Sequence, residues 1–212
     1  MKIAVLGSGM VGQALCAGLH SNGHEVMMGT RDPNSEKIHA WLKSTGGVRA
    51  GSFVEAAQFG EIAFLCTAWS GTESALQLVG EDSLAGKVVI DVTNPLEFTD
   101  KGPRLVVGHT DSGGEQVQRW LPKAHVVKAL NTVTAGTMIS PQREEGTPDM
   151  FIAGNDPGAK QKVTELLKSF GWSVIDMGGI EESRLLEPLA MIWIKYYIRN
   201  KTFTHAFRLL RQ

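Results

Sequence analysis

The chain opens with MKIAVLGSGMVG, residues 1–12, and this stretch decides its fold. Residues 3–6 are apolar at every position, which is typical of a strand buried on both faces of a parallel sheet. A turn of the form G-x-G-x-x-G follows at residues 7–12, and residues 14–19 continue as a helix with small residues on one side. Strand, glycine turn and helix in this order predict a dinucleotide-binding site.

Each glycine of the turn has its own physical task. Gly7 permits the tight turn, Gly9 lets the backbone approach a pyrophosphate, and Gly12 lets the helix pack closely on the strand. The N-terminus of the helix adds free N–H groups and a positive partial charge, which favour phosphate. The alternative is a glycine turn that binds nothing. The setting favours cofactor binding, and the predicted contacts are Gly7, Ser8, Gly9, Met10, Val11 and Gly12.

The second predicted strand, residues 25–28, indicates which dinucleotide is bound. In a site for NAD this strand ends in Asp or Glu, which binds the ribose 2′-hydroxyl. Here it ends in Gly29-Thr30-Arg31, and a guanidinium suits a 2′-phosphate. We therefore expect NADP(H) rather than NAD(H), bound by Thr30 and Arg31 with help from Ser35. The alternative for Arg31 is a solvated surface charge, and Asp32 is expected to cap the next helix.

Composition limits the classes of protein. A chain of 212 residues is long enough for one large domain, and its formal net charge of −1 lacks the basic excess of a nucleic-acid-binding protein. No apolar stretch approaches the length of a membrane span, and the N-terminus lacks a signal-peptide pattern, so we expect a cytoplasmic protein. Cys16 and Cys66 are expected to be buried reduced thiols, and no metal-ligand set is recognised.

The rest of the chain alternates predicted strands and helices. The expected fold class is α/β: a doubly wound, Rossmann-type, mostly parallel sheet in a single domain, residues 1–212, with residues 180–212 as an appended C-terminal helical extension. Ser52 and Asp156 are expected to cap helices. The predicted strands are residues 2–6, 25–28, 48–50, 62–67, 88–92, 126–130, 150–153 and 173–176, and the last predicted helix covers 183–210. Residues 97–111 and 139–148 are predicted to be long irregular loops, which often line sites.

Several of these motifs together resemble one enzyme family. Over most of its length the chain is similar to the NADP-dependent oxidoreductases that use the deazaflavin coenzyme F420. The resemblance rests on residues 7–12, 29–31, 68–69, 128–132, and 176–178 followed by 183–185. Residues 92–95 and 127–131 also resemble the cytosolic domain of the six-transmembrane metalloreductases, which passes electrons from NADPH to a flavin. Since the chain has no transmembrane helices of its own, we do not expect it to be a metalloreductase itself.

The resemblance implies a reaction and a set of contacts. The reaction is hydride transfer between NADP(H) and a flavin or a deazaflavin such as F420, and it requires no strong acid from the protein. The residues implied near the ribose, the nicotinamide and the second ring are Thr67, Ala68, Trp69, Thr93, Asn94, Pro95, Asn131 and Ala135. Asn131 stands where the F420 enzymes carry His, which leaves the second substrate open between F420, a flavin and another acceptor. The alternatives are a core role for Trp69 and turn roles for Asn94 and Asn131.

Two other functions stay open. One is an imine- or hydroxyacid-type reductase that uses NADPH but lacks the usual second helical domain, since few residues follow the last predicted strand. The other is a non-catalytic module that senses NADP(H) and binds a protein partner. The sequence does not name the small-molecule redox substrate.

The last predicted helix carries more apolar residues than one contact with the sheet requires. Leu189, Trp193 and Tyr197 share one face, and such a surface must be covered. We therefore expect a homodimer with this helix at its interface. Arg184 and Glu187, three residues apart on the same helix, are expected to form an ion pair.

Overall fold

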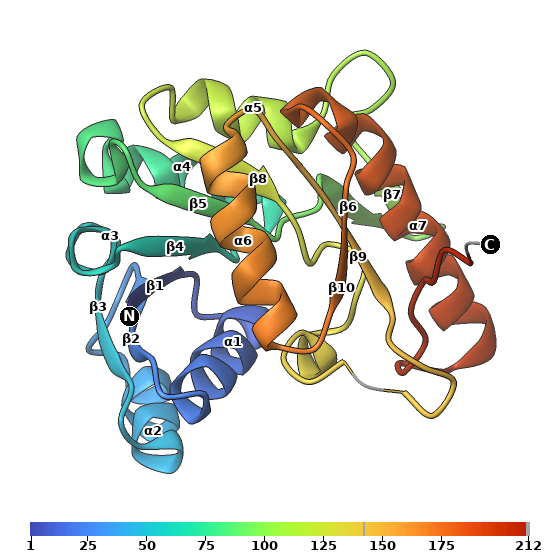
Figure 1. Ribbon diagram of the computed structural model, residues 1–212. Helices are drawn as coiled ribbons and strands as arrows, with labels where there is room; N and C mark the ends of the chain where they lie inside the picture. The colour runs from blue at the N-terminus through green and yellow to red at the C-terminus, as the bar shows by residue number, and fades with distance from the viewer. Residues whose placement is uncertain (142, 211–212) are drawn as a thin grey trace.

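The computed structural model describes residues 1–141 and 143–210. Within them, an eight-stranded sheet forms the centre, in the strand order β10-β9-β8-β5-β4-β1-β2-β3 (Figure 1). Its strands are β1 (Lys2–Leu6), β2 (Glu25–Thr30), β3 (Arg49–Ser52), β4 (Ile62–Leu65), β5 (Val88–Asp91), β8 (His125–Lys128), β9 (Asp149–Gly154) and β10 (Ser173–Asp176). All eight strands that the sequence predicts lie in this sheet.

The strand directions confirm the predicted doubly wound, mostly parallel α/β fold. Every neighbouring pair from β3 through β8 is parallel, whereas β9 is antiparallel to β8 and β10 is parallel to β9. Residues 3–6 of β1 are 0% exposed, because helices cover both faces of the sheet. This burial on both sides explains why the sequence of β1 is apolar without alternation.

Helices form one layer on each face of the sheet. One layer contains α1 (Met10–Ser21), α2 (Glu36–Thr45) and α6 (Pro157–Ser169), which bury a core together with residues such as Ile3 and Phe64. The other contains α3 (Phe53–Phe59), α4 (Trp69–Val79) and α5 (Gly113–Trp120), which bury a second core with residues such as Leu6 and Val89. Short 3₁₀ turns lie at Glu81–Leu84, Ala135–Thr137 and Ile180–Glu182.

Two predicted caps are confirmed. Ser52 Oγ accepts a hydrogen bond from the Glu55 N–H at 3.2 Å, and the Glu55 carboxylate accepts one from the Ser52 N–H at 2.7 Å, which completes a capping box for α3. Asp156 Oδ1 accepts the Ala159 N–H at 2.6 Å, and Pro157 takes the first position of α6. These local signals set where the two helices begin.

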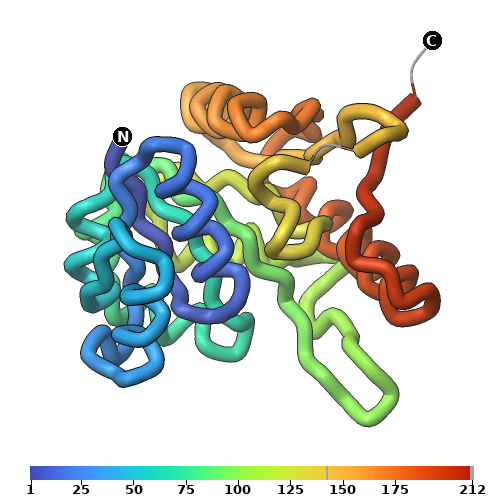
Figure 2. Tube along the Cα trace, turned by 90° about the horizontal axis from the view of Figure 1, so that it is seen from below, coloured from blue at the N-terminus to red at the C-terminus, as the bar shows by residue number. Residues whose placement is uncertain are grey.

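The prediction of an irregular loop over residues 97–111 is wrong for its first part. β6 (Leu96–Thr99) and β7 (Gly102–Leu105) form an antiparallel hairpin, in which Phe98 is opposite Pro103. The hairpin projects from the body of the molecule, and α7 lies beside it (Figure 2). Its strands are four residues each and one contains a proline, so they lack the alternating apolar pattern that predicts a strand.

The last helix, α7 (Ser183–Asn200), is shorter than predicted. Lys201 adopts a left-handed backbone with φ of 55°, which ends the helix, and residues 201–210 are neither helix nor strand. The segment folds back on α7: the His205 ring stacks on Trp193 at 4.3 Å between centroids, and Trp193 Nε1 donates to His205 O. Trp193 is therefore covered by its own chain. Among the described residues, no helix is both long and apolar enough to cross a membrane.

Candidate functional site

The candidate site lies at the carboxyl edge of the sheet, where the strand order reverses between β1 and β4. The chain leaves β1 into α1 on one side and leaves β4 into α4 on the other. Crevices of this kind are where open α/β sheets bind ligands. Backbone hydrogen bonds from Gly7 N to Gly29 O and from Cys66 N to Leu6 O, each 2.9 Å, hold the edges of the crevice together.

The three glycines of the first turn have different surroundings. A Cβ on Gly7 would lie 2.7 Å from Cys66 O, and the φ of Gly7 is +134°, so the turn itself requires glycine there. A Cβ on Gly12 would lie 2.0 Å from Gly7 O, so only glycine lets α1 approach the turn. A Cβ on Gly9 would meet no atom within 4 Å. The chain itself therefore does not need glycine at position 9, whereas a phosphate approaching the N-terminus of α1 would.

A first cavity of about 400 Å³ extends along this turn. Seven residues that the sequence predicts to contact a cofactor line it: Gly7, Ser8, Gly9, Thr30, Arg31, Thr67 and Ala68. The sequence did not point to the remaining lining residues, which are Phe53, Cys66, Ser70, Gly71, Ser74 and Ala75. Those from α4 face the cavity because of how the helix packs, and the sequence carries no local signal for that.

The end of β2 places a hydroxyl and a cation at this cavity. Thr30 Oγ1 and Ser8 Oγ are 3.1 Å apart and share a hydrogen bond, which joins β2 to the glycine turn. Arg31 is exposed, and within the described residues it forms no hydrogen bond or ion pair. An unpaired guanidinium at the mouth of a cavity is suited to an anion.

The residues after Arg31 differ from expectation in two ways. Asp32 does not cap α2: its Oδ1 accepts the Asn34 N–H at 3.1 Å, and Ser35 occupies the N-cap position. Ser35 Oγ donates to Asp32 O at 3.1 Å, and Ser35 does not line the first cavity. The turn through Pro33 delays the start of α2 to Glu36, so Asp32 lies too early to cap it.

A second cavity of about 420 Å³ continues from the first. Both are lined by Cys66, Thr67, Ala68 and Ser70, so the two cavities adjoin, and we refer to them together as the cleft. The other residues that line the second cavity are Val11, Trp69, Val92, Thr93, Asn94, Leu96, Glu97 and Phe98. Six residues that the sequence predicts as contacts line neither cavity: Met10, Gly12, Ser35, Pro95, Asn131 and Ala135.

Trp69 stands at the first turn of α4 and has two kinds of neighbour. It lines the second cavity, and its ring lies 5.6 Å from the Trp120 ring of α5. It is half-buried and packs against the core on that face of the sheet. The two readings of the sequence, a cavity residue and a core aromatic, are therefore both compatible with its position.

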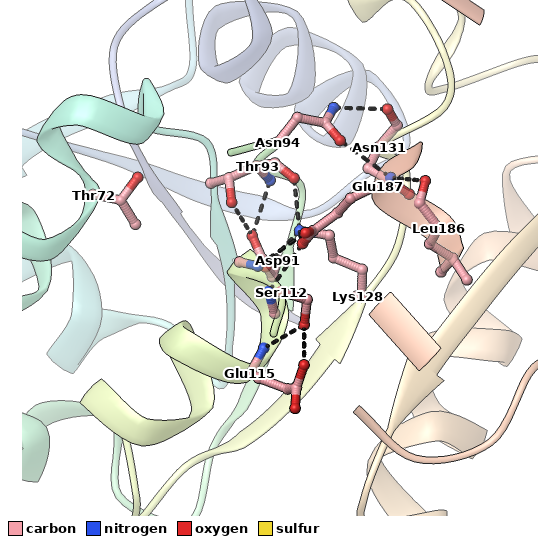
Figure 3. Close-up of polar contacts among 12 residues, drawn as sticks. Thr72, Asp91, Thr93, Asn94, Ser112, Glu115, Lys128, Asn131, Leu186 and Glu187 are labelled. Carbon is pink, nitrogen blue, oxygen red and sulfur yellow. Dashed lines mark hydrogen bonds and ion pairs between the residues drawn. The ribbon is translucent and has the colours of Figure 1, made fainter. Parts of the chain in front are cut away.

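Asn94 and Asn131 bond to each other across two loops. Asn94 Nδ2 donates to Asn131 O at 2.9 Å, and Asn131 Nδ2 donates to Asn94 Oδ1 at 3.2 Å and to Leu186 O at 2.8 Å (Figure 3). Asn94 lines the second cavity, whereas Asn131 is buried beside it. In the described part of the chain, Asn131 Oδ1 has no hydrogen-bond partner.

A buried ion cluster supports this wall of the cleft. Lys128 is 0% exposed, and its Nζ donates to Asp91 Oδ2 at 2.9 Å, to Thr93 O at 2.7 Å and to Glu187 Oε1 at 2.8 Å (Figure 3). The three N–H bonds of the ammonium group thus meet three acceptors. Burial alone would lower the pKa of Lys128, but the charges of Asp91 and Glu187 outweigh it and raise this pKa. Lys128 therefore stays charged.

The carboxylates extend the cluster to the loops around the cavity. Asp91 Oδ1 accepts the Thr93 N–H at 2.9 Å and the Thr93 hydroxyl at 2.7 Å. The Glu187 carboxylate accepts the N–H groups of Gly113 and Gly114 at 2.9 and 3.0 Å, at the N-terminus of α5. The cluster, defined as Asp91, Lys128 and Glu187, therefore ties β5, β8, α5 and α7 together and holds Thr93 in the cavity wall.

This arrangement corrects the ion pair expected within α7. Glu187 pairs with Lys128, and Arg184 pairs with Glu115 of α5. A spacing of three residues brings Arg184 and Glu187 near each other on a helix, but α5 and β8 offer both of them partners from outside. Glu187 also accepts the two N–H groups at the N-terminus of α5, and these hydrogen bonds help to compensate for the burial of its carboxylate.

Two further observations bear on the chemistry of the cleft. Burial raises the pKa of Cys66 well above its usual range, so the thiol stays protonated and is a poor nucleophile. In residues 1–141 and 143–210, no three His, Cys, Asp or Glu side chains gather where they could hold a metal ion. What the cleft does offer is a glycine turn, an unpaired guanidinium, apolar walls and rigidly held Thr93 and Asn94.

The chain is similar to several known proteins. The family model for coenzyme F420-dependent NADP oxidoreductases matches residues 2–95. A crystal structure from Arthrobacter sp. FB24, of a protein provisionally assigned as an F420-dependent NADP reductase, is 40% identical, covers 100% of both chains and superposes with a TM-score of 0.94. The F420-dependent NADP reductase of Methanocaldococcus jannaschii is 29% identical and covers 95% of each chain. Metalloreductase STEAP3 of Rattus norvegicus is 28% identical over 90% of this chain, which spans only 36% of that protein.

Proposed function

The chain belongs to the family of NADP oxidoreductases that depend on coenzyme F420, and from this premise we propose that it transfers hydride between NADP(H) and the ring of a flavin or deazaflavin. Membership makes it an NADP-dependent oxidoreductase. The acceptor ring is the proposal. The observation that carries it is a pair of adjoining cavities: the first suits the phosphates of a dinucleotide, and the second has apolar walls for a flat ring.

The residues of the first cavity are suited to hold NADP(H). The open space at Gly9 receives the pyrophosphate at the N-terminus of α1, and Thr30 and Arg31 bind the 2′-phosphate. Thr67 and Ala68 line both cavities and Trp69 lines the second, and these three residues orient the ribose and the nicotinamide. When bound, the cofactor supplies a hydride, which is two electrons and one proton, and the acceptor ring takes a further proton from water.

The second cavity orients the acceptor. Thr93 and Asn94 line this cavity, and the buried cluster and Asn131 hold them in place. Because the acceptor takes hydride into a ring, the protein needs to align two rings more than it needs to donate a proton. A substrate imine or ketone would need a proton donor, and Glu97, the titratable carboxyl of this cavity, is paired with Arg104.

A screen of acceptors tests this function. NADPH oxidation is followed at 340 nm, roughly the absorbance maximum of reduced nicotinamides, with F420, FMN, FAD, riboflavin and a ferric chelate. We expect turnover with at least one flavin or deazaflavin. Turnover with the ferric chelate alone would contradict the proposal, and tight NADPH binding without any turnover would favour a module that senses NADP(H).

The preference for NADPH is predicted to depend on Arg31. A charge-assisted hydrogen bond contributes about 1.5–3 kcal/mol, so Arg31→Ala should weaken NADPH binding by roughly 10- to 150-fold and leave NADH binding nearly unchanged. Fluorescence titration measures both. Arg49→Ala, which removes an exposed guanidinium from β3 outside the cleft, is the control and should change neither affinity. Equal losses for both cofactors in Arg31→Ala would contradict the assignment.

We also propose that the protein is a homodimer in which α7 forms part of the interface. Trp193 is covered by its own chain, but Leu185, Ile192 and Tyr196 are 59%, 60% and 51% exposed on α7. These residues are spaced by seven and four, so they share a face of the helix, and a second copy of that face would cover them.

Ile192→Asp is therefore predicted to convert the dimer into a folded monomer. Sedimentation velocity at micromolar concentration measures the change. Leu78→Asp is the control, because Leu78 is 55% exposed on α4, away from this face. A wild-type protein that sediments as a monomer would rule the proposal out.

We place this reaction in the cytoplasm. Cys16 and Cys66 are free thiols, and both are buried. Reduced cysteines are the rule in a reducing compartment, which supports this placement.

A further inference from the structure

Phe98 is an exposed aromatic residue that is not among the contacts proposed above for the cofactor and the acceptor. It stands in β6 of the hairpin and is 81% exposed, yet it lines the second cavity. Exposed large apolar side chains that border a cavity are more informative than isolated ones, because they indicate a surface that a ligand or partner covers. Its neighbour Leu96 lines the same cavity and is half-buried.

The hairpin holds Phe98 in a defined place. Thr99 Oγ1 donates to Gly102 O at 2.9 Å, and the Lys101 N–H donates to Thr99 Oγ1 at 3.2 Å, so the turn is closed by side-chain hydrogen bonds. At the base of the hairpin, the Val106 N–H donates to Pro95 O at 2.8 Å. The exposure of Phe98 is therefore a feature of an ordered hairpin, which projects from the rest of the chain (Figure 2).

The walls of the second cavity are suited to a flat conjugated ring. Val11, Val92 and Leu96 contribute apolar surface, and Trp69 adds an aromatic one. Asn94 contributes an amide group at its edge, where ring carbonyls and N–H groups could be recognised. Aromatic side chains stack on such rings in offset or tilted arrangements, which adds to the gain from burial.

From these observations we propose that Phe98 is the outer wall of the acceptor site and packs against the conjugated ring of the acceptor. The inference rests on the proposed function and adds to it the residue that closes the acceptor site on its outer side. Binding of the ring would bury Phe98, which is exposed without it. Phe98 thus selects the acceptor and makes no contribution to binding of the dinucleotide phosphates.

Two substitutions test this role. Phe98→Ala removes the ring and should raise the acceptor KM roughly 10-fold, with the NADPH dissociation constant unchanged. Phe98→Trp keeps an aromatic surface and should restore most of the affinity. Phe203→Ala is the matched control: Phe203 is 53% exposed and packs on Tyr197 at 4.2 Å, outside both cavities of the cleft.

Binding is measured separately from turnover. Fluorescence anisotropy of FMN, titrated with each protein variant in the presence of saturating NADP⁺, gives the dissociation constant of the ring without any reaction. We expect weaker binding to Phe98→Ala by the same factor, and unchanged binding to Phe203→Ala. The acceptor screen tests the proposed function independently, because it uses only the wild-type protein.

Three results would overturn the role of Phe98. One is an unchanged FMN dissociation constant and acceptor KM in Phe98→Ala. Another is a wild-type protein that binds none of F420, FMN, FAD and riboflavin. A third is dissociation of an oligomer by Phe98→Ala in sedimentation velocity, which would assign the exposed ring to a contact between subunits. If the wild type oxidises NADPH with a flavin but Phe98→Ala behaves identically, the proposed function stands and this inference fails.

Discussion

Gly9→Val is expected to abolish measurable NADPH binding while the protein keeps its fold. A Cβ at position 9 would meet no protein atom within 4 Å, so we expect the chain to keep its fold with a side chain there. The same side chain would occupy the space that a pyrophosphate needs at the N-terminus of α1. The affinity for NADPH should fall by more than about 100-fold, which corresponds to roughly 3 kcal/mol. Fluorescence titration measures the affinity, and thermal unfolding measures the fold.

Gly12→Val is the matched comparison, because Gly12 belongs to the same motif but is required by the packing of the chain itself. Its Cβ would lie 2.0 Å from Gly7 O, so the substitution must move α1 away from the turn. We expect a clear drop in melting temperature from Gly12→Val and none from Gly9→Val. If Gly9→Val retained both its NADPH affinity and its melting temperature, the glycine turn would not be the phosphate site.

Of the substitutions proposed here, Lys128→Met should lower the free energy of unfolding the most. Methionine matches the length of the lysine side chain but leaves Asp91 and Glu187 buried, at 0% and 1% exposure, without a compensating charge. Breaking a buried ion pair in this way costs about 3–5 kcal/mol. Urea unfolding at neutral pH measures the free energy of unfolding.

Two further variants test whether the loss of stability comes from the buried charges or would follow from the removal of any lysine that pairs with carboxylates. Lys123 also contacts two carboxylates, Glu81 and Asp82, but all three side chains are about half exposed or more, so Lys123→Met should cost about 1 kcal/mol or less. Adding Glu187→Gln to Lys128→Met removes one of the uncompensated charges and should recover part of the stability. A loss in Lys128→Met no larger than in Lys123→Met would show that the cluster contributes little.

The fold could be predicted because its signals are local. The central strands β1, β4 and β5 are buried over nearly their whole length, so apolar runs such as residues 3–6 and 62–65 identify them. The hairpin β6–β7 lacked such a signal because its strands are short, exposed and contain Pro103. The end of α7 was missed because Lys201 takes a left-handed backbone conformation that sequence rarely indicates for lysine.

The candidate site was predictable only where it follows directly from strand ends. The residues after β1, β2, β4 and β5 reach the same edge of a parallel sheet, which is why many of the expected contacts line one cleft. The partners of Lys128 could not be predicted, since Asp91 and Glu187 are far from it in sequence. Phe98 could not be recognised either, because its role depends on a hairpin that the sequence did not indicate.

The reaction that we propose is direct hydride transfer from NADPH to an acceptor ring held in the same cleft. Stereospecifically deuterated NADPH tests it most directly: the (4R) and (4S) forms are mixed in turn with the enzyme and F420 or FMN under anaerobic conditions, and reduction of the ring is followed by stopped-flow absorbance. We predict that one labelled form slows ring reduction and the other does not, because the cleft presents one face of the nicotinamide to the acceptor. Identical rates with both forms, or no reduction of either ring, would contradict the account.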